Sequence, residues 1–384
     1  MVDLFRKAPS YFMFLAGISV MFIADVLSPD RTISELENRS LKQEPVFSMS
    51  SLLDNSLTAE YGEYVKDQVV LRDEMINFKS AAEYFLFQKI ESNNILYGRN
   101  NREFVRHFQL TSSQKDLFDK NIRALRQFQE KHPKETLFLI APTSSILYGD
   151  QMNGNPPQID LNALMDRVIE EIGEENCLDI RNDMQSVSGN LFYCTDHHWT
   201  TDGALVAYKV FCRETDRQPI IPEERTRREL EGFFGTNWSA SRKPFSKPDS
   251  ITYYDNSSRL KIYEVTGENQ FSLSQETVLY DEDKFVSHDM YGMFLHGNNG
   301  FSRIEGNGTG KILIIKDSYA NCFIPFLTED YGQIDVLDFR NYGYGPDSLI
   351  NSENYETILV LYNIESLFSD TALINIIRPS VKKP

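Results

Sequence analysis

Short, continuous apolar runs recur along the chain and are separated by segments in which apolar residues have a helical spacing. Runs of this kind are typical of strands buried on both faces, as in a parallel sheet. They are TLFLIAP (136–142), KILIIKDS (311–318), QIDVLDF (333–339) and TILVLYN (357–363). The predicted helices are residues 113–131, 159–172, 202–214, 320–328 and 365–376. Strands that alternate with helices predict an α/β fold, a three-layer α/β/α domain with a mainly parallel sheet.

Two other regions have different patterns. Residues 225–300 are rich in Tyr, Phe, Ser, Asn and Gly and contain short alternating pieces, so we expect a β-rich insertion there. Residues 52–87 have apolar positions at spacings of three and four, which predict a helical neck. We therefore expect a linker and neck over residues 28–110 and the main domain over residues 111–384.

The amino-terminal region has the longest uncharged run. Seventeen residues from Ala8 to Ala24 carry no charge, with Arg6 and Lys7 before them. A bilayer span needs roughly 17–25 apolar residues, and the preceding positive charges predict a cytoplasmic amino terminus. Bulky Phe22 is unfavourable for signal cleavage, so we expect an uncleaved signal anchor over residues 1–27, with a cleaved signal peptide as the alternative. Either alternative predicts a domain outside the cytoplasm, and the first predicts a single-pass protein of the cell membrane.

Composition narrows the range of partners. The net charge of -17 argues against nucleic-acid binding, which requires a basic surface. The four cysteines, Cys177, Cys194, Cys212 and Cys322, are scattered and do not form a zinc pattern. We expect the four cysteines to be buried free thiols, with one or two disulfides as the alternative. We expect no cofactor.

Ser318 lies where a buried strand ends and a helix is predicted to begin. In open α/β sheets, ligand sites gather at the carboxyl ends of strands. The free N–H groups at the start of the next helix can also stabilise an oxyanion. Ser318 is therefore a candidate nucleophile, and its alternative role is that of an ordinary helix N-cap.

A second candidate segment is Asp196-His197-His198-Trp199. A serine nucleophile needs a base, usually a histidine that is oriented by a carboxylate. In an extended segment, Asp196 and His198 share one face and His197 points away. We therefore expect a triad of Ser318, His198 and Asp196, a helix that begins at Thr200 or Thr201, and Trp199 packed beneath the site.

Two alternatives to the triad stay open. Asp196 and His198 could bind a metal ion if a third ligand came from His107, His132, His288, His296 or a distant acid. The segment could also be purely structural, with a capping carboxylate and buried imidazoles.

These motifs together resemble a known family. TDHHWTTDGA at 195–204 followed by IIKDSYANCFIPFL at 314–327 is similar to the DHHW protein family, which is similar to the alginate O-acetyltransferase-like relatives of SGNH hydrolases. Further landmarks are ENRSLKQEPVFS (37–48), YVKDQVVLRD (64–73), GTNWSAS (235–241) and DVLDFRNY (335–342). The resemblance implies an SGNH-like fold with Asp196 and His198 as the acid–base pair and Ser318 as the nucleophile. It also implies acyl transfer to an extracellular polysaccharide, with a membrane acyltransferase as the partner that delivers the acyl group.

Other residues are weaker site candidates. FLHGNNG (294–300) resembles a glycine-rich family block and offers Gly297 and Asn298 for oxyanion binding, although His296 stands where a second glycine is expected. Tyr319 follows the serine, and Arg340 is expected either to bind substrate or to pair with Asp338 or Asp335. The predicted function is serine-dependent transfer or hydrolysis of an O-acyl group, expected to be acetyl, on a cell-surface or exported polysaccharide. The alternatives are a non-catalytic glycan-binding or assembly protein and a metal-dependent hydrolase.

Overall fold

The computed structural model describes residues 9–34, 36–37, 39–134 and 136–380. The chain divides into two compact units, one of Met1–Lys89 with Arg242–Pro244 and the other of Ile90–Ser241 with Phe245–Pro384.

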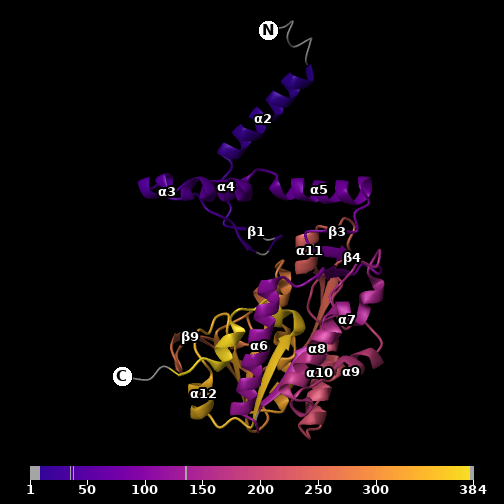
Figure 1. Cartoon of the computed structure of the whole chain (residues 1–384), viewed down its shortest axis with the longest axis vertical. Coiled ribbons are helices and arrows are strands. Elements are labelled where there is room, and N and C mark those ends of the chain that lie inside the picture. Colours follow the sequence, from indigo (N-terminus) through magenta and orange to yellow (C-terminus); the bar gives the residue numbers. More distant parts are fainter. Residues whose placement is uncertain (1–8, 35, 38, 135, 381–384) are drawn as a thin grey trace. The chain divides into compact units, whose positions relative to one another are not determined.

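The first unit contains a long apolar helix, α2 (Pro9–Leu27), none of whose 19 residues is buried (Figure 1). By length and composition it could cross a membrane, and a signal sequence would pass the same test. The two-residue strands β1 (Ile33–Ser34) and β2 (Arg39–Ser40) pair after it.

The helix expected over residues 52–87 is in fact three helices. They are α3 (Met49–Leu53), α4 (Ser56–Gln68) and α5 (Arg72–Leu86). Asn55 and Leu71 separate them in left-handed backbone conformations, with φ of 63° and 59°. A non-glycine residue in this conformation ends a right-handed helix, and apolar periodicity does not reveal such a break.

The second unit is built on a seven-stranded sheet of order β10-β9-β11-β13-β12-β14-β6. The four strands predicted from apolar runs lie side by side and parallel: β6 (Thr136–Ala141), β12 (Lys311–Lys316), β13 (Gln333–Leu337) and β14 (Thr357–Asn363). The other three are antiparallel: β9 (Arg259–Gly267), β10 (Gln270–Val278) and β11 (Phe301–Glu305). The sheet is therefore mixed and not mainly parallel, because residues expected in a separate insertion extend the same sheet.

Helices cover both faces of this sheet. Along β12, Ile312 and Ile314 join one apolar core, which includes residues of α10 (Thr201–Glu214). Leu313 and Ile315 point to the opposite core, with α6 (Ser112–Lys131) and α8 (Leu161–Ile172). This alternation along a strand buried on both faces explains its continuous apolar sequence.

Two predicted helices are short 3₁₀ segments instead. Residues 320–328 lie in η6 (Ser318–Cys322) and η7 (Ile324–Glu329), and residues 365–376 lie in η8 (Ile364–Phe368) and η9 (Leu373–Ile377). Pro325 stands in the first turn of η7, where its missing N–H cannot continue a helix that began earlier.

The remaining elements are short. β7 (Arg227–Phe233) and β8 (Asp249–Tyr254) pair with each other, as do the three strands β3 (Glu91–Ser92), β4 (Ile95–Tyr97) and β5 (Glu103–Val105). The other helices are α7 (Ser144–Tyr148), η1 (Gly149–Gln151), η2 (Glu174–Asn176), α9 (Arg181–Ser186), η3 (Glu224–Thr226), α11 (Thr236–Ser241), η4 (Glu282–Val286), η5 (Met290–Met293) and α12 (Asp347–Ser352).

Candidate active site

Ser318 lies just after the carboxyl end of β12, an inner strand of the sheet, where it opens η6. Its residue is half-buried, so the hydroxyl is within reach of a ligand. The N-cap of η6 is Asp317, whose Oδ1 accepts the N–H of Tyr319 at 2.9 Å. Asp317 Oδ2 also accepts both the N–H and Nδ2 of Asn363, at 2.8 and 2.7 Å. The capping role left open for Ser318 is therefore taken by Asp317, and the serine hydroxyl is available for another partner.

That partner is His198. The distance from Ser318 Oγ to His198 Nε2 is 2.8 Å, and His198 Nδ1 lies 2.6 Å from Asp196 Oδ1. Asp196 and His198 are buried, with exposed fractions of 1% and 5%. The structure thus joins Ser318, His198 and Asp196 in one continuous hydrogen-bonded chain.

Asp196 is held as an ionised carboxylate. Its Oδ2 accepts the N–H and the hydroxyl of Thr236, at 2.8 and 2.9 Å. Burial by itself would raise the pKa of Asp196, but the charges of His197 and His198 and the hydrogen bonds from His198 and Thr236 lower it well below the usual range. This carboxylate can therefore fix the tautomer of His198 without taking its proton.

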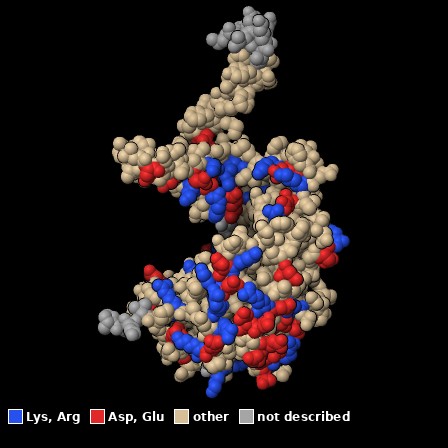
Figure 2. All heavy atoms as spheres, viewed as in Figure 1, with Lys and Arg blue, Asp and Glu red and all other residues tan. Residues whose placement is uncertain are grey.

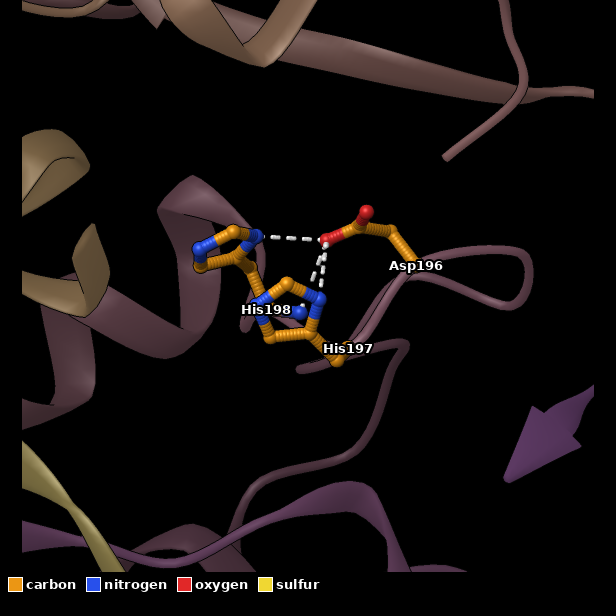
Figure 3. A group of neighbouring side chains, drawn as sticks. All are labelled: Asp196, His197 and His198. Carbon is orange, nitrogen blue, oxygen red and sulfur yellow. Dashed lines mark hydrogen bonds and ion pairs between the residues drawn. The ribbon is translucent and has the colours of Figure 1, made fainter. Parts of the chain in front are cut away.

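The expected position of His197 is wrong. Its ring does not point away from His198: the two ring centroids are 3.9 Å apart, and both imidazoles lie beside Asp196 (Figure 3). The cause is a tight turn, in which the N–H of Tyr193 donates to the carbonyl of His198 at 3.2 Å and the N–H of His198 donates to Asp196 Oδ1 at 2.9 Å. An aspartate that binds the N–H two residues later bends the backbone, so the alternation of an extended strand does not hold.

His197 itself is bound to Thr236. Its Nδ1 lies 2.7 Å from Thr236 Oγ1, and its side chain is 35% exposed. Partial burial and the adjacent His198 lower the pKa of His197.

Two residues that the sequence did not single out complete the support of His198. The ring of Tyr291 stacks on the imidazole at 3.9 Å between centroids, and its hydroxyl donates to the carbonyl of Ser318 at 3.0 Å. Thr236 lies in the GTNWSAS landmark, which was a usable signal for it. Tyr291 lies in no motif, and only the folded chain reveals it.

Trp199 is fully buried, and its Nε1 donates to the carbonyl of Tyr319 at 2.8 Å. The indole therefore packs beneath the site, as expected, and is unavailable for stacking on a sugar. Thr200 is the N-cap of α10, since its hydroxyl accepts the N–H of Gly203 at 3.2 Å.

Tyr319 offers no donor to a substrate. Its N–H is bound by Asp317, its hydroxyl donates to the carbonyl of His197, and its side chain is fully buried. Among the described residues, the N–H of Ser318 has no acceptor, so the serine's own amide is the backbone donor left at the site.

Gly297 ends a left-handed stretch that begins at Leu295, and Asn298 follows it beside the end of β12. Asn298 is exposed, and its Oδ1 accepts Lys316 Nζ at 2.8 Å and Asn321 Nδ2 at 3.2 Å, which leaves its amide N–H groups as the outward donor. Gly297 has φ of 82°, and His296 has φ of 55°. A positive φ is most easily adopted by glycine, and this is why a glycine is expected at position 296. In this chain His296 adopts the same conformation.

Arg340 forms one of the two expected salt bridges. Its guanidinium binds both carboxylate oxygens of the buried Asp338, with Nε at 2.8 Å from Oδ1. Lys316 Nζ lies 3.3 Å from the same carboxylate, whereas Asp335 pairs with Arg303. The Arg340 side chain is still 38% exposed.

The structure brings together only three potential ligands for a metal ion. The donor atoms of Asp196, His197 and His198 lie within 4.8 Å of one another. Two of them, His198 Nδ1 and Asp196 Oδ1, are already bonded to each other, and within the described part of the chain none of the other four histidines joins the group. The arrangement favours a proton relay.

Comparisons with known proteins agree with this fold. The family model described as DHHW protein matches residues 165–337, which confirms the resemblance to that family. A DHHW family protein from Eubacterium siraeum is 21% identical at a TM-score of 0.64, covering 76% of this chain and 98% of that chain. Bacillus cereus PatB1 with a sulfonyl adduct is 16% identical at a TM-score of 0.54, covering 71% and 95%. These likenesses show an α/β fold with a large mixed sheet and helices.

A weaker likeness is to the O-acetyltransferase domain of Pseudomonas putida AlgJ, at 15% identity and a TM-score of 0.43, covering 72% of this chain and 92% of that chain. A search of curated proteins finds no sequence match.

Proposed function

Because the chain carries the DHHW signature and a hydrogen-bonded serine–histidine–aspartate chain, we propose that it is a serine-dependent O-acyl transferase or esterase, acting on acetyl groups of a cell-surface or exported polysaccharide. The observation that carries the proposal is the contact between the half-buried Ser318 and His198 at the carboxyl edge of the sheet. In this proposal the fold is an SGNH-like α/β/α domain, residues 1–27 anchor the protein in the membrane, and the domain acts outside the cytoplasm.

The proposed reaction uses the three side chains in turn. Ser318 Oγ attacks the acyl carbonyl while its proton moves to His198 Nε2, and Asp196 stabilises the imidazolium that forms. The leaving group takes the proton from His198, which leaves an acyl-serine. A sugar hydroxyl or water then gives its proton to His198 and attacks the acyl-serine. His198 returns that proton to Ser318 Oγ as the bond between the acyl carbon and Oγ breaks, which completes transfer or hydrolysis.

The negative charge on the carbonyl oxygen needs donors of its own. We assign the N–H of Ser318 and the side-chain amide of Asn298, held by Lys316 and Asn321, as the oxyanion donors. A general base contributes roughly 10²–10⁴-fold in rate. Removal of one oxyanion donor costs about 10²–10³-fold.

One further point supports covalent catalysis by serine. A sulfonyl group is an electrophile for nucleophilic side chains, and PatB1, which shares this fold, has been solved with a sulfonyl adduct. The resemblance to the DHHW family also implies a membrane acyltransferase as the partner that supplies the acyl group.

Activity of the chain from about residue 30 on an activated acetyl ester tests the proposal. We expect turnover that persists with a chelator, labelling of Ser318 by a sulfonyl fluoride, and loss of both in Ser318→Ala. Ser145→Ala is the matched control, because Ser145 also follows the carboxyl end of a parallel strand, β6, and should change neither. Turnover abolished by chelator would favour the metal alternative. Glycan binding without turnover or labelling would favour a binding protein.

A further inference from the structure

Helix α5 of the first unit exposes its apolar face. The apolar residues recur at spacings of three and four, and so they form one stripe along the helix. The stripe consists of Leu71, Met75, Phe78, Ala82, Phe85 and Leu86. Phe78 and Leu86 are 77% and 76% exposed.

The opposite side of the same helix is the covered one. Ser80, which lies roughly opposite the stripe, is buried, and its hydroxyl donates to the carbonyl of Arg242 at 2.8 Å. A helix of a water-soluble domain normally buries its apolar face and exposes its polar face. In α5 the large apolar side chains of the stripe stay exposed while Ser80 is buried, so the stripe requires an apolar environment that the first unit does not provide.

The start of α5 is tied to the end of α2. Asp25 Oδ1, in the last turns of α2, accepts the N–H of Val70 at 3.0 Å. Just after α2, Arg31 pairs with Asp73 at 2.9 Å and exchanges two backbone–side-chain hydrogen bonds with Gln68. If α2 crosses a bilayer, these contacts hold the first residues of α5 where α2 leaves the lipid.

Further ion pairs make this junction rigid. Arg39 binds both oxygens of Asp67, at 2.9 and 2.6 Å, and Arg72 binds both oxygens of Glu37 at 3.0 Å. The hydrogen bonds from Arg39 lower the pKa of Asp67 well below its usual range. These four residues belong to the landmarks at 37–48 and 64–73, so the charges of these landmarks have a structural role at the junction.

We propose that the apolar stripe of α5 lies in the interface of the bilayer that α2 spans, with its side chains between the lipid headgroups and the acyl chains. A lipid surface fits because the stripe is rich in phenylalanine and begins beside the end of an apolar helix that carries no charge from Pro9 to Ala24 (Figure 2). The chain is acidic, so apolar insertion and not attraction to anionic lipid holds the stripe, and the contact is insensitive to salt. This inference rests on the membrane anchor of the proposed function.

Fluorescence of the full-length chain in phosphatidylcholine vesicles tests the proposal. An environment-sensitive fluorophore is attached to a cysteine introduced by Phe78→Cys or Phe85→Cys on the stripe. The matched controls are Asn77→Cys and Lys79→Cys, which flank Phe78 and are exposed on the sides of the helix. Ile18→Cys in α2 reports on the anchor, and the unsubstituted chain gives the background of the native cysteines.

We expect nitroxide-labelled lipid to quench positions 18, 78 and 85 severalfold more than positions 77 and 79, at low and at high salt. Aqueous iodide should show the opposite order. Lipid quenching at 18 but not at 78 and 85 would overturn the inference and leave the anchor intact. Protection of 78 and 85 from both quenchers would also overturn it, because a protein surface would then cover the stripe. Absence of lipid quenching at 18 would contradict the anchor itself.

Discussion

At the scale of single residues, His198 is held from four directions. Asp196 binds Nδ1, Ser318 meets Nε2, and the rings of His197 and Tyr291 lie against its two sides with centroids 3.9 Å away. An imidazole confined in this way keeps one rotamer and one tautomer, which is what a base in a proton relay requires.

The two adjacent histidines should differ sharply on substitution. His198→Gln removes the base, so we expect turnover of an acetyl ester to fall by roughly 10²–10⁴-fold with the fold retained. His197→Gln keeps a polar group near Thr236, so we expect turnover to fall severalfold at most. Steady-state kinetics on folded protein, checked by circular dichroism, measures both. Equal losses in the two variants would contradict the assignment of the base.

The pH dependence of stability tests the environment of His197. Because the pKa of His197 is lowered in the folded chain, the folded state binds fewer protons there than the unfolded state does. Its contribution to stability is therefore present above the ordinary histidine pKa, about 6.5, and is lost as the pH falls below it. Urea unfolding at pH 7.5 and 5.5 should show a smaller difference in His197→Gln than in the unsubstituted chain.

At the scale of elements, the site depends on a close approach between two segments. Gly235, which links β7 to α11, lies so near Asp196 that a Cβ at this position would overlap the carboxylate and the Cβ of the aspartate. The N–H of the next residue, Thr236, binds the same carboxylate. The glycine of the GTNWSAS landmark is therefore required by contact and not by an unusual backbone angle.

Gly235→Ala should accordingly displace Asp196 and lower turnover by at least about tenfold, because orientation of the base depends on that carboxylate. Gly149→Ala is the control, since a Cβ there meets no atom within 4 Å and the backbone is helical. Kinetics and thermal unfolding of both variants provide the measurement. Full activity of Gly235→Ala would show that Asp196 is not held as described.

The elements differ in how well the sequence predicts them. The strands β6, β12, β13 and β14 were predictable because burial on both faces leaves a continuous apolar run. The helices α6, α8 and α10 were predictable to within two residues because each has a clear apolar face. The mixed sheet was not predictable, since β9 and β10 carry many exposed polar residues and their pattern indicated an insertion.

The site was only partly predictable. Tyr291 contacts His198 through tertiary packing, and the turn at Asp196 depends on a hydrogen bond from the His198 N–H to the aspartate side chain.

At the scale of the whole molecule, the four cysteines are free thiols. Burial raises the pKa of Cys177 and of Cys322 to about 12, and that of Cys212 to about 11. Thiols that stay protonated are poor nucleophiles, so these three should react slowly in the folded protein.

Thiol titration of protein purified without reductant should therefore find four reactive groups per chain after denaturation. A reductant should leave the thermal unfolding temperature unchanged, because no cross-link is lost. A count of two or none in denaturant, together with a lower unfolding temperature in reductant, would show disulfides instead.

The position of β12 in the sheet also determines when the candidate site can form during synthesis of the chain. It lies between β13 and β14, and both of these strands follow it in the chain. The ribosome must therefore release residues up to Asn363 before β12 can be enclosed, although His198 is made 120 residues before Ser318. In the proposed mechanism, Ser318 can therefore be activated by His198 only late in the synthesis of the chain. A truncated product that lacks only the last two strands would carry all three side chains and still be inert.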